Sequence, residues 1–166
     1  LETGYEYLDL NATPKTLWEL VPREEGHEFD LPTKASICSW SKNKAVLKWR
    51  QEDGTGIEVT ATVSLDKKKP MSYWDIKLTS FEGDKLMEVY FPRISNIKEF
   101  TNEEVAIAPW TGHLYKNYRK VNKVLSQRSV IRPTMQVEVI YGEEPSGLYI
   151  ATNDVNSMAK GSYFEF

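Results

Sequence analysis

The chain has 166 residues and a mass of 19.2 kDa, the size of one ordinary domain. Hydrophobic residues make up 40% of it and charged residues 27%, a mix that excludes disordered, collagen-like and membrane-spanning classes. With 21 basic and 24 acidic side chains, the formal net charge of −3 does not indicate a nucleic-acid partner. We therefore expect a single folded domain over residues 1–166, with no membrane span.

Short segments in which apolar and polar residues alternate dominate the chain and predict strands. The clearest hairpin joins residues 45–51 to 57–65 through Asp53-Gly54, a pair that suits a tight turn. The other expected strands, in chain order, are 5–10, 17–21, 35–40, 73–79, 85–91, 94–100, 105–108, 134–141 and 148–152. About ten short strands with turn residues between them predict an all-β fold, a two-sheet antiparallel β-sandwich.

One segment departs from the strand period. Within residues 114–127, the apolar residues Leu114, Tyr118, Val121 and Leu125 recur at helical spacing, with basic side chains on the other side. An amphipathic helix and a long basic loop both fit this pattern. We expect at most one short helix, near residues 114–126, with its basic side solvated.

The sequence contains no motif that identifies an enzyme. It has no glycine-rich phosphate loop and no serine nucleophile elbow. His27 and His113 lie far apart and lack Cys or His partners at ligand spacing, so we predict no metal site and no cofactor. Nothing selects a pair of carboxylates for glycoside hydrolysis, so we predict no catalytic residue in this chain.

Tryptophans inside the expected strands have a structural default role. Trp40, Trp49 and Trp74 fall in strand patterns, where we expect them to pack in the core or on a sheet face. Cys38, the single cysteine, lies in an apolar stretch and is expected to be a buried structural thiol.

A loop around Trp110 is the candidate sugar-binding site. An indole face beside polar groups suits a sugar ring; the alternative is that Trp110 caps the edge of the sandwich. His113 and Tyr115 would add hydrogen bonds from the same loop. We expect Asn153 and Asp154 to form a weaker second site.

Five short motifs follow one another along residues 35–154. They are Val63-Ser64-Leu65, residues 73–78, residues 89–94, Met135-Gln136 and residues 147–154. In this order they resemble the amino-terminal domain of certain bacterial glycoside hydrolases. The resemblance implies a galactose-mutarotase-like β-supersandwich, which is normally followed by a (β/α)8 barrel of ~250 residues that holds the catalytic acids.

The resemblance implies a non-catalytic accessory domain of a carbohydrate-active enzyme. Its expected partners are a carbohydrate and the C-terminal catalytic barrel of the same polypeptide, and its expected location is secreted, periplasmic or cell-surface. An independent carbohydrate-binding module and a structural or adhesive β-sandwich stay open, because sandwiches host all three roles. The chain begins at Leu1 rather than Met, so we expect a processed product or a fragment of a longer protein.

Overall fold

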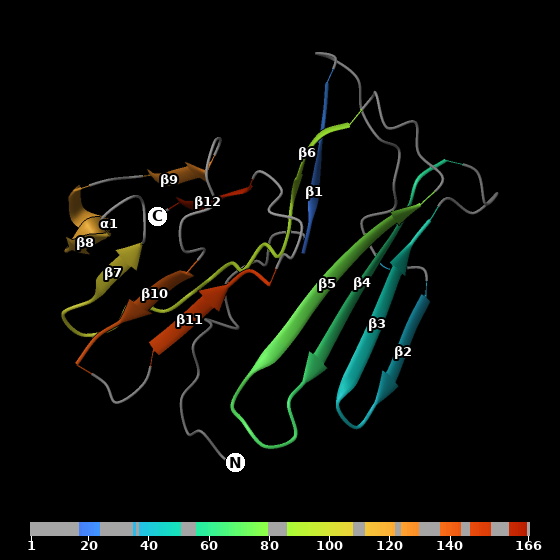
Figure 1. The fold of residues 1–166 in the computed structure, drawn as a ribbon, viewed down its shortest axis with the longest axis horizontal. Coiled ribbons are helices and arrows are strands. Elements are labelled where there is room, and N and C mark those ends of the chain that lie inside the picture. The colour runs from blue at the N-terminus through green and yellow to red at the C-terminus, as the bar shows by residue number, and fades with distance from the viewer. Residues whose placement is uncertain are drawn as a thin grey trace. The chain divides into compact units, whose positions relative to one another are not determined.

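The computed structural model describes residues 17–23, 35, 37–50, 56–79, 86–107, 112–121, 124–129, 137–143, 147–153 and 160–165. Within them the chain forms antiparallel strands and one short helix, α1 (Tyr118–Val121) (Figure 1). The predicted all-β class with at most one short helix is therefore confirmed. The chain divides into two compact units, residues 1–97 and 98–166, and the expectation of a single domain stays a prediction.

The first unit contains a four-stranded sheet in the order β2-β3-β4-β5 and a two-stranded ribbon of β1 and β6 (Figure 1). Its strands are β1 (Glu19–Pro22), β2 (Ile37–Ser41), β3 (Lys44–Trp49), β4 (Glu58–Leu65), β5 (Ser72–Thr79) and β6 (Leu86–Tyr90). The predicted antiparallel pairing of these two strands is confirmed, since Ala45 lies opposite Val63 and Leu47 opposite Ala61; the expected Asp53-Gly54 turn lies outside the described residues.

The core of the first unit forms where one face of the sheet is covered. Trp49, Val59 and Ala61 are buried on that face. Trp18 packs on Trp49 edge to face, with ring centroids 5.5 Å apart, a preferred geometry for aromatic pairs. The other side chains packed against this cluster are Leu17, Leu20, Ala35, Leu47, Ile57, Ile76 and Phe91. Residues from the β1 and β6 segments thus form a second layer on the sheet, a sandwich-like arrangement.

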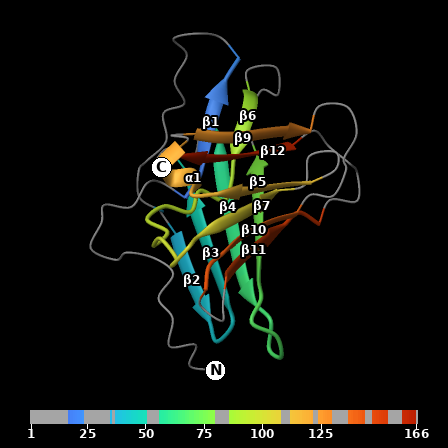
Figure 2. The same ribbon diagram turned by 90° about the vertical axis from the view of Figure 1, so that its left-hand side faces the viewer.

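The second unit contains a four-stranded sheet in the order β11-β10-β7-β8 (Figure 1). It also contains a ribbon of β9 and β12 (Figure 2). Its strands are β7 (Glu104–Ile107), β8 (His113–Lys116), β9 (Val124–Ser129), β10 (Val137–Tyr141), β11 (Gly147–Ala151) and β12 (Lys160–Glu165). The buried hydrophobic residues are Phe100, Val105, Ile107, Tyr118 and Ile140.

The segment with helical spacing is mostly strand. Leu114 lies on β8, directly opposite Ala106 of β7, because the backbone of residues 113–116 pairs with the edge of that strand. Asn117, with φ of 51°, turns the chain into the single helical turn of α1, and β9 follows. Backbone hydrogen bonding to β7 therefore outweighs the helical spacing of the apolar residues in this segment.

Two further differences concern the strand list. Residues 94–100 do not form the expected strand, and the strand β12 was not expected. The strand expected over residues 5–10 lies outside the described residues. No helix in the described part of the chain has the length and apolar character needed to cross a bilayer.

The first prediction compares two tryptophans of the same sheet. Trp49 is 6% exposed and Trp40 is 76% exposed. Trp49→Ala leaves a cavity under the β1 segment and should lower the free energy of unfolding by ~3–5 kcal/mol. Trp40→Ala removes an exposed ring and should change it by ~0.5 kcal/mol or less. Chemical denaturation of both variants measures the difference, and equal losses would contradict the assignment of Trp49 to the core.

Candidate functional site

The described part of the expected Trp110 loop lies on β8, in the second unit. His113 is exposed and Tyr115 is partly buried; their side chains share one face of the strand. The Tyr115 hydroxyl lies 3.4 Å from His113 Nδ1, and the two ring centroids are 5.9 Å apart. Gly112 precedes the strand with φ of 84°, a left-handed conformation that glycine adopts without strain.

The structure separates the expected main and second sites. Asn153 is exposed just after β11, whereas His113 begins β8, and these are the two edge strands of the sheet. Across the sheet, His113 pairs with Ile107, Ile107 with Glu138, and Glu138 with Ile150. His113 and Asn153 therefore lie at the same end of the sheet. Three strand spacings, about 14 Å, separate the edge strands. Trp110 and Asp154 lie outside the described residues.

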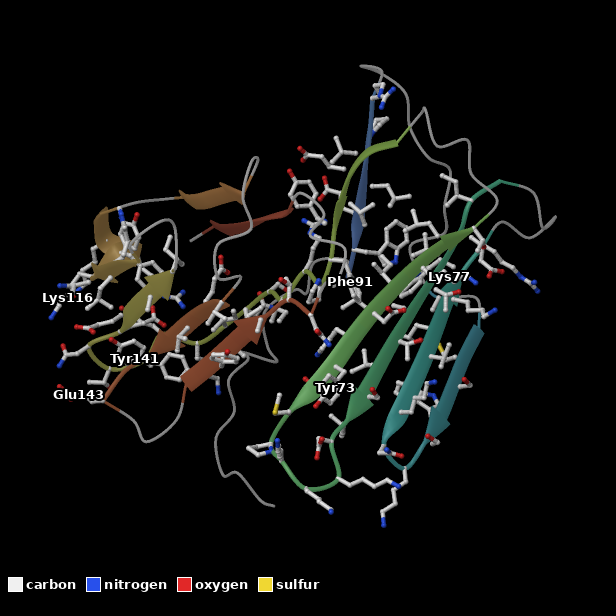
Figure 3. The ribbon with its side chains drawn as sticks, viewed as in Figure 1. Tyr73, Lys77, Phe91, Lys116, Tyr141 and Glu143 are labelled. Atoms are coloured by element: carbon white, nitrogen blue, oxygen red, sulfur yellow. The ribbon has the colours of Figure 1, made fainter. Side chains whose placement is uncertain are left out.

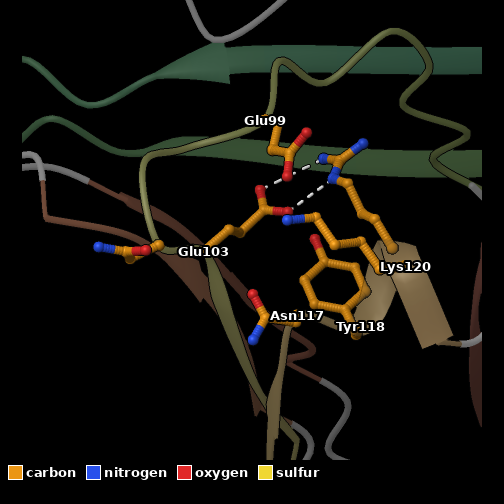
Figure 4. Close-up of a pocket in the computed structure, with 7 residues that line it drawn as sticks. Glu99, Glu103, Asn117, Tyr118 and Lys120 are labelled. Atoms are coloured by element: carbon orange, nitrogen blue, oxygen red, sulfur yellow. Dashed lines mark hydrogen bonds and ion pairs between the residues drawn. The ribbon is translucent and has the colours of Figure 1, made fainter.

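A small polar hollow of about 60 Å³ lies beside α1 (Figure 4). It is lined by Glu99, Asn102, Glu103, Asn117, Tyr118, Arg119 and Lys120. Glu103 is 5% exposed, and its Oε1 accepts a hydrogen bond from Arg119 Nε at 2.6 Å. Its Oε2 accepts hydrogen bonds from Arg119 Nη2 and from the backbone N–H of Phe100, both at 3.3 Å.

These contacts show that Glu103 and Arg119 form a structural ion pair at the hollow. Burial opposes the charge on Arg119, but the hydrogen bond to Glu103 and nearby charges outweigh it and raise the pKa of Arg119. Burial raises the pKa of the Tyr118 phenol above its ordinary value, and the nearby Glu103 carboxylate adds to the shift. Since both Glu103 oxygens accept bonds from the protein, the pair ties the 99–103 turn to α1 and leaves little room for a reacting group.

A row of four residues on the first unit presents aromatic rings to solvent. Trp40 of β2 lies opposite Ala45, Ala45 opposite Val63, and Val63 opposite Trp74 of β5. We call these four residues the aromatic row. Both tryptophans lie on a sheet face, one of the two roles expected for them, but Trp40 is 76% and Trp74 39% exposed there.

The reason is that only part of the sheet face is covered. The layer from β1 covers Trp49, Val59 and Ala61, whereas the aromatic row lies two residues further along the strands, toward the hairpin turns. Cys38, on the same edge strand as Trp40, is also exposed, which corrects the expectation of a buried thiol.

The Trp74 ring is held in place by two neighbours. Its Nε1–H donates a 2.8 Å hydrogen bond to Ser72 Oγ, and its ring centroid lies 6.4 Å from that of Phe91 at a tilt of 58°. The exposed side chains of Leu65 and Met71 extend the apolar surface beside it. With small residues at Ala45 and Val63, the two indoles stand at the ends of a row about 14 Å long.

Charge is segregated between the two faces of this sheet. Strand alternation places the charged residues of β2–β5 on the face opposite the aromatic row. They are Lys44, Lys48, Glu58, Asp75 and Lys77. The aromatic row therefore lies on a sheet face that carries no charged strand residue.

The chain matches no protein-family model, and no curated protein or solved structure is significantly similar to it. Among the described residues, no group of three His, Cys, Asp or Glu side chains is arranged to hold a metal ion. The exposed aromatic row is thus the feature of the described residues that most favours a ligand. Sequence alternation alone placed its tryptophans on a sheet face but gave no sign of where the covering layer ends.

The second prediction tests the ion pair beside α1. Glu103→Ala leaves the partly buried Arg119 guanidinium without its carboxylate, which should lower the free energy of unfolding by ~3–5 kcal/mol. Lys120→Ala, at the exposed neighbouring position, should change it by ~0.5 kcal/mol or less. Denaturant unfolding measures both, and similar values for the two variants would show that the pair does not hold the turn.

Proposed function

We propose that this chain is a non-catalytic, carbohydrate-binding accessory domain of a glycoside hydrolase. The observation that carries the proposal is the aromatic row, with Trp40 and Trp74 exposed on a sheet face without strand charges. An indole face offers a flat apolar surface on which the C–H bonds of a sugar ring stack, while nearby polar groups meet its hydroxyls. Such a surface favours the flat apolar face of a rigid sugar ring.

The carboxylates of Glu103 and Glu104 in the second unit are held by structural contacts, which agrees with the proposed non-catalytic role of the chain. Glu103 accepts hydrogen bonds at both oxygens, as described above. Glu104 accepts hydrogen bonds from Tyr141 Oη at 2.6 Å and from Lys116 Nζ at 2.9 Å. These two contacts, Tyr141 first, hold the pKa of Glu104 below its usual value. A carboxyl group that stays ionised is a poor general acid, so Glu104 is not assigned that role. The catalytic acids are assigned to the (β/α)8 barrel on the resemblance alone.

The Trp110 loop stays a proposed second contact. His113 and Tyr115 present polar atoms from β8, and Asn153 is exposed at the other edge of the same sheet. The aromatic row lies in the first unit, so the two candidate sites are tested independently. An independent carbohydrate-binding module would use the same aromatic row, and the full open reading frame distinguishes it from an accessory domain.

The third prediction tests the aromatic row. Affinity gel electrophoresis against a panel of soluble polysaccharides should show retardation of the wild-type chain. Trp40→Ala should weaken that binding at least about tenfold, equivalent to ~1.4 kcal/mol, and leave the thermal midpoint nearly unchanged because Trp40 is exposed.

Tyr73→Ala is the matched control. Tyr73 is 50% exposed and adjacent to Trp74 in sequence, but it points to the opposite face of β5. The Tyr73→Ala variant should bind polysaccharides as tightly as the wild-type chain does. Loss of binding in Trp110→Ala but not in Trp40→Ala would move the site to the loop, and no binding by the wild type to any polysaccharide would contradict the proposal.

A further inference from the structure

Two lysine-rich turns that are separate in sequence meet beside the aromatic row. The turn between β2 and β3 carries Lys42, and Lys44 begins β3 on the face opposite the aromatic row. The turn between β4 and β5 carries Lys67–Lys69. The backbone N–H of Leu65 donates a 2.8 Å hydrogen bond to the carbonyl of Asn43, which joins the two hairpins at this end. Figure 1 shows both hairpin turns at the same end of the sheet. We call the five lysines the lysine cluster.

The lysine cluster is a local excess of positive charge on an acidic chain. All five lysines are exposed, and none forms an ion pair with a described carboxylate. The one acid in these turns is Asp66, so five lysines minus one aspartate leave a charge of +4, against −3 for the whole chain.

Asp66 acts mainly on the shape of its own turn. Its Oδ1 accepts hydrogen bonds from the backbone N–H groups of Lys68 at 2.7 Å and Lys69 at 3.0 Å. These two bonds are the main reason that the pKa of Asp66 is lowered, and the charge of Lys69 adds to the effect. The carboxylate thereby fixes the turn that presents the lysines.

The lysine cluster adjoins the aromatic row directly. Trp40 precedes Lys42 by two residues, and exposed Met71 follows Lys69 by two. A ligand that stacks on the indoles therefore extends toward the ammonium groups of the adjoining turns, and exposed charges act over roughly 8 Å at physiological salt. The arrangement combines an uncharged stacking surface with a cationic border.

Resting on the proposed function, we propose that the saccharide bound here is an acidic polysaccharide, one that carries carboxylate or sulfate groups. Its sugar rings stack on Trp40 and Trp74, and its anionic groups face the lysine cluster. Ammonium groups recognise such anions as point charges without a fixed geometry, which suits a repeating polymer.

An anionic lipid surface also attracts lysines beside aromatic rings. The position of the apolar groups favours the polysaccharide. The turns themselves, residues 41–44 and 66–70, hold no large aliphatic or aromatic side chain, although the exposed Trp40, Leu65 and Met71 flank them. The indoles lie instead along the sheet face, at opposite ends of a row of about 14 Å, which suits an extended chain.

The fourth prediction uses polymer pairs that share a backbone. The purified chain is run in affinity gels with polygalacturonate against its methyl ester, and with dextran sulfate against dextran. It should bind at least one acidic polymer about tenfold more tightly than its neutral counterpart at low salt. That preference should disappear at 1 M NaCl, where the Debye length falls to ~3 Å.

Two double variants with the same net charge separate a local from a global effect. Lys42→Glu with Lys68→Glu should abolish the preference for the acidic polymer and leave neutral binding unchanged. Lys77→Glu with Lys120→Glu should keep the preference within about twofold. Lys77 is exposed in the half of β5 away from the hairpin turns (Figure 3), and Lys120 is exposed on α1. Circular dichroism verifies that each variant is folded. If the variant with Lys42→Glu and Lys68→Glu does not fold, Lys68→Glu alone is tested in its place.

The outcomes separate this inference from the function on which it rests. Equal binding of acidic and neutral polymers that still needs Trp40 would overturn the acidic ligand and leave the proposed function standing. Binding to no polysaccharide would overturn both. Binding to phosphatidylserine vesicles in the absence of any polysaccharide binding would overturn both in favour of a membrane surface.

Discussion

The packing of Trp18 against Trp49 sets the boundary between the core and the open surface of the first unit. The edge-to-face pair, with centroids 5.5 Å apart, marks where the layer from the β1 segment covers the sheet. Below this layer Val59 and Ala61 are buried completely. Two residues along the strands the layer ends, and the same apolar face continues uncovered as the aromatic row.

This boundary explains how one alternating pattern serves two purposes. Trp49 and Trp40 lie on the same face of the same sheet, yet one stabilises the fold and the other is available to a ligand. Removing an exposed aromatic ring lowers the free energy of unfolding only slightly, because no cavity forms where the ring was. Ala45 and Val63 are such neighbours, and they leave both indoles of the aromatic row accessible.

Charged side chains have different roles in the two units. In the second unit, the Glu103–Arg119 pair is buried and uses its hydrogen-bonding capacity to hold a turn against α1. In the first unit, the lysine cluster is solvated and unpaired with described carboxylates, so its field extends outward. A buried pair stabilises a local structure, whereas an exposed excess of one sign attracts ligands of the other sign. The proposed acidic polysaccharide follows from this contrast.

The amino-acid sequence by itself determined the strand class, most strands and the central hairpin. Alternation over residues 57–65 is a local signal that predicts β4 and its buried face, and β4 pairs with β3 over that segment. The sequence did not determine the use of residues 113–116, whose helical spacing yields to pairing with β7.

Only the tertiary structure decided which apolar residues are exposed and which charges are neighbours. Trp40 and Trp74 read as packing residues in sequence, because alternation identifies a face but carries no information on how far a second layer covers it. The lysines of residues 42–44 and 67–69 belong to two segments that are separate in the sequence. They become one cationic cluster because a hydrogen bond from Leu65 to Asn43 joins two hairpins more than twenty residues apart in the chain.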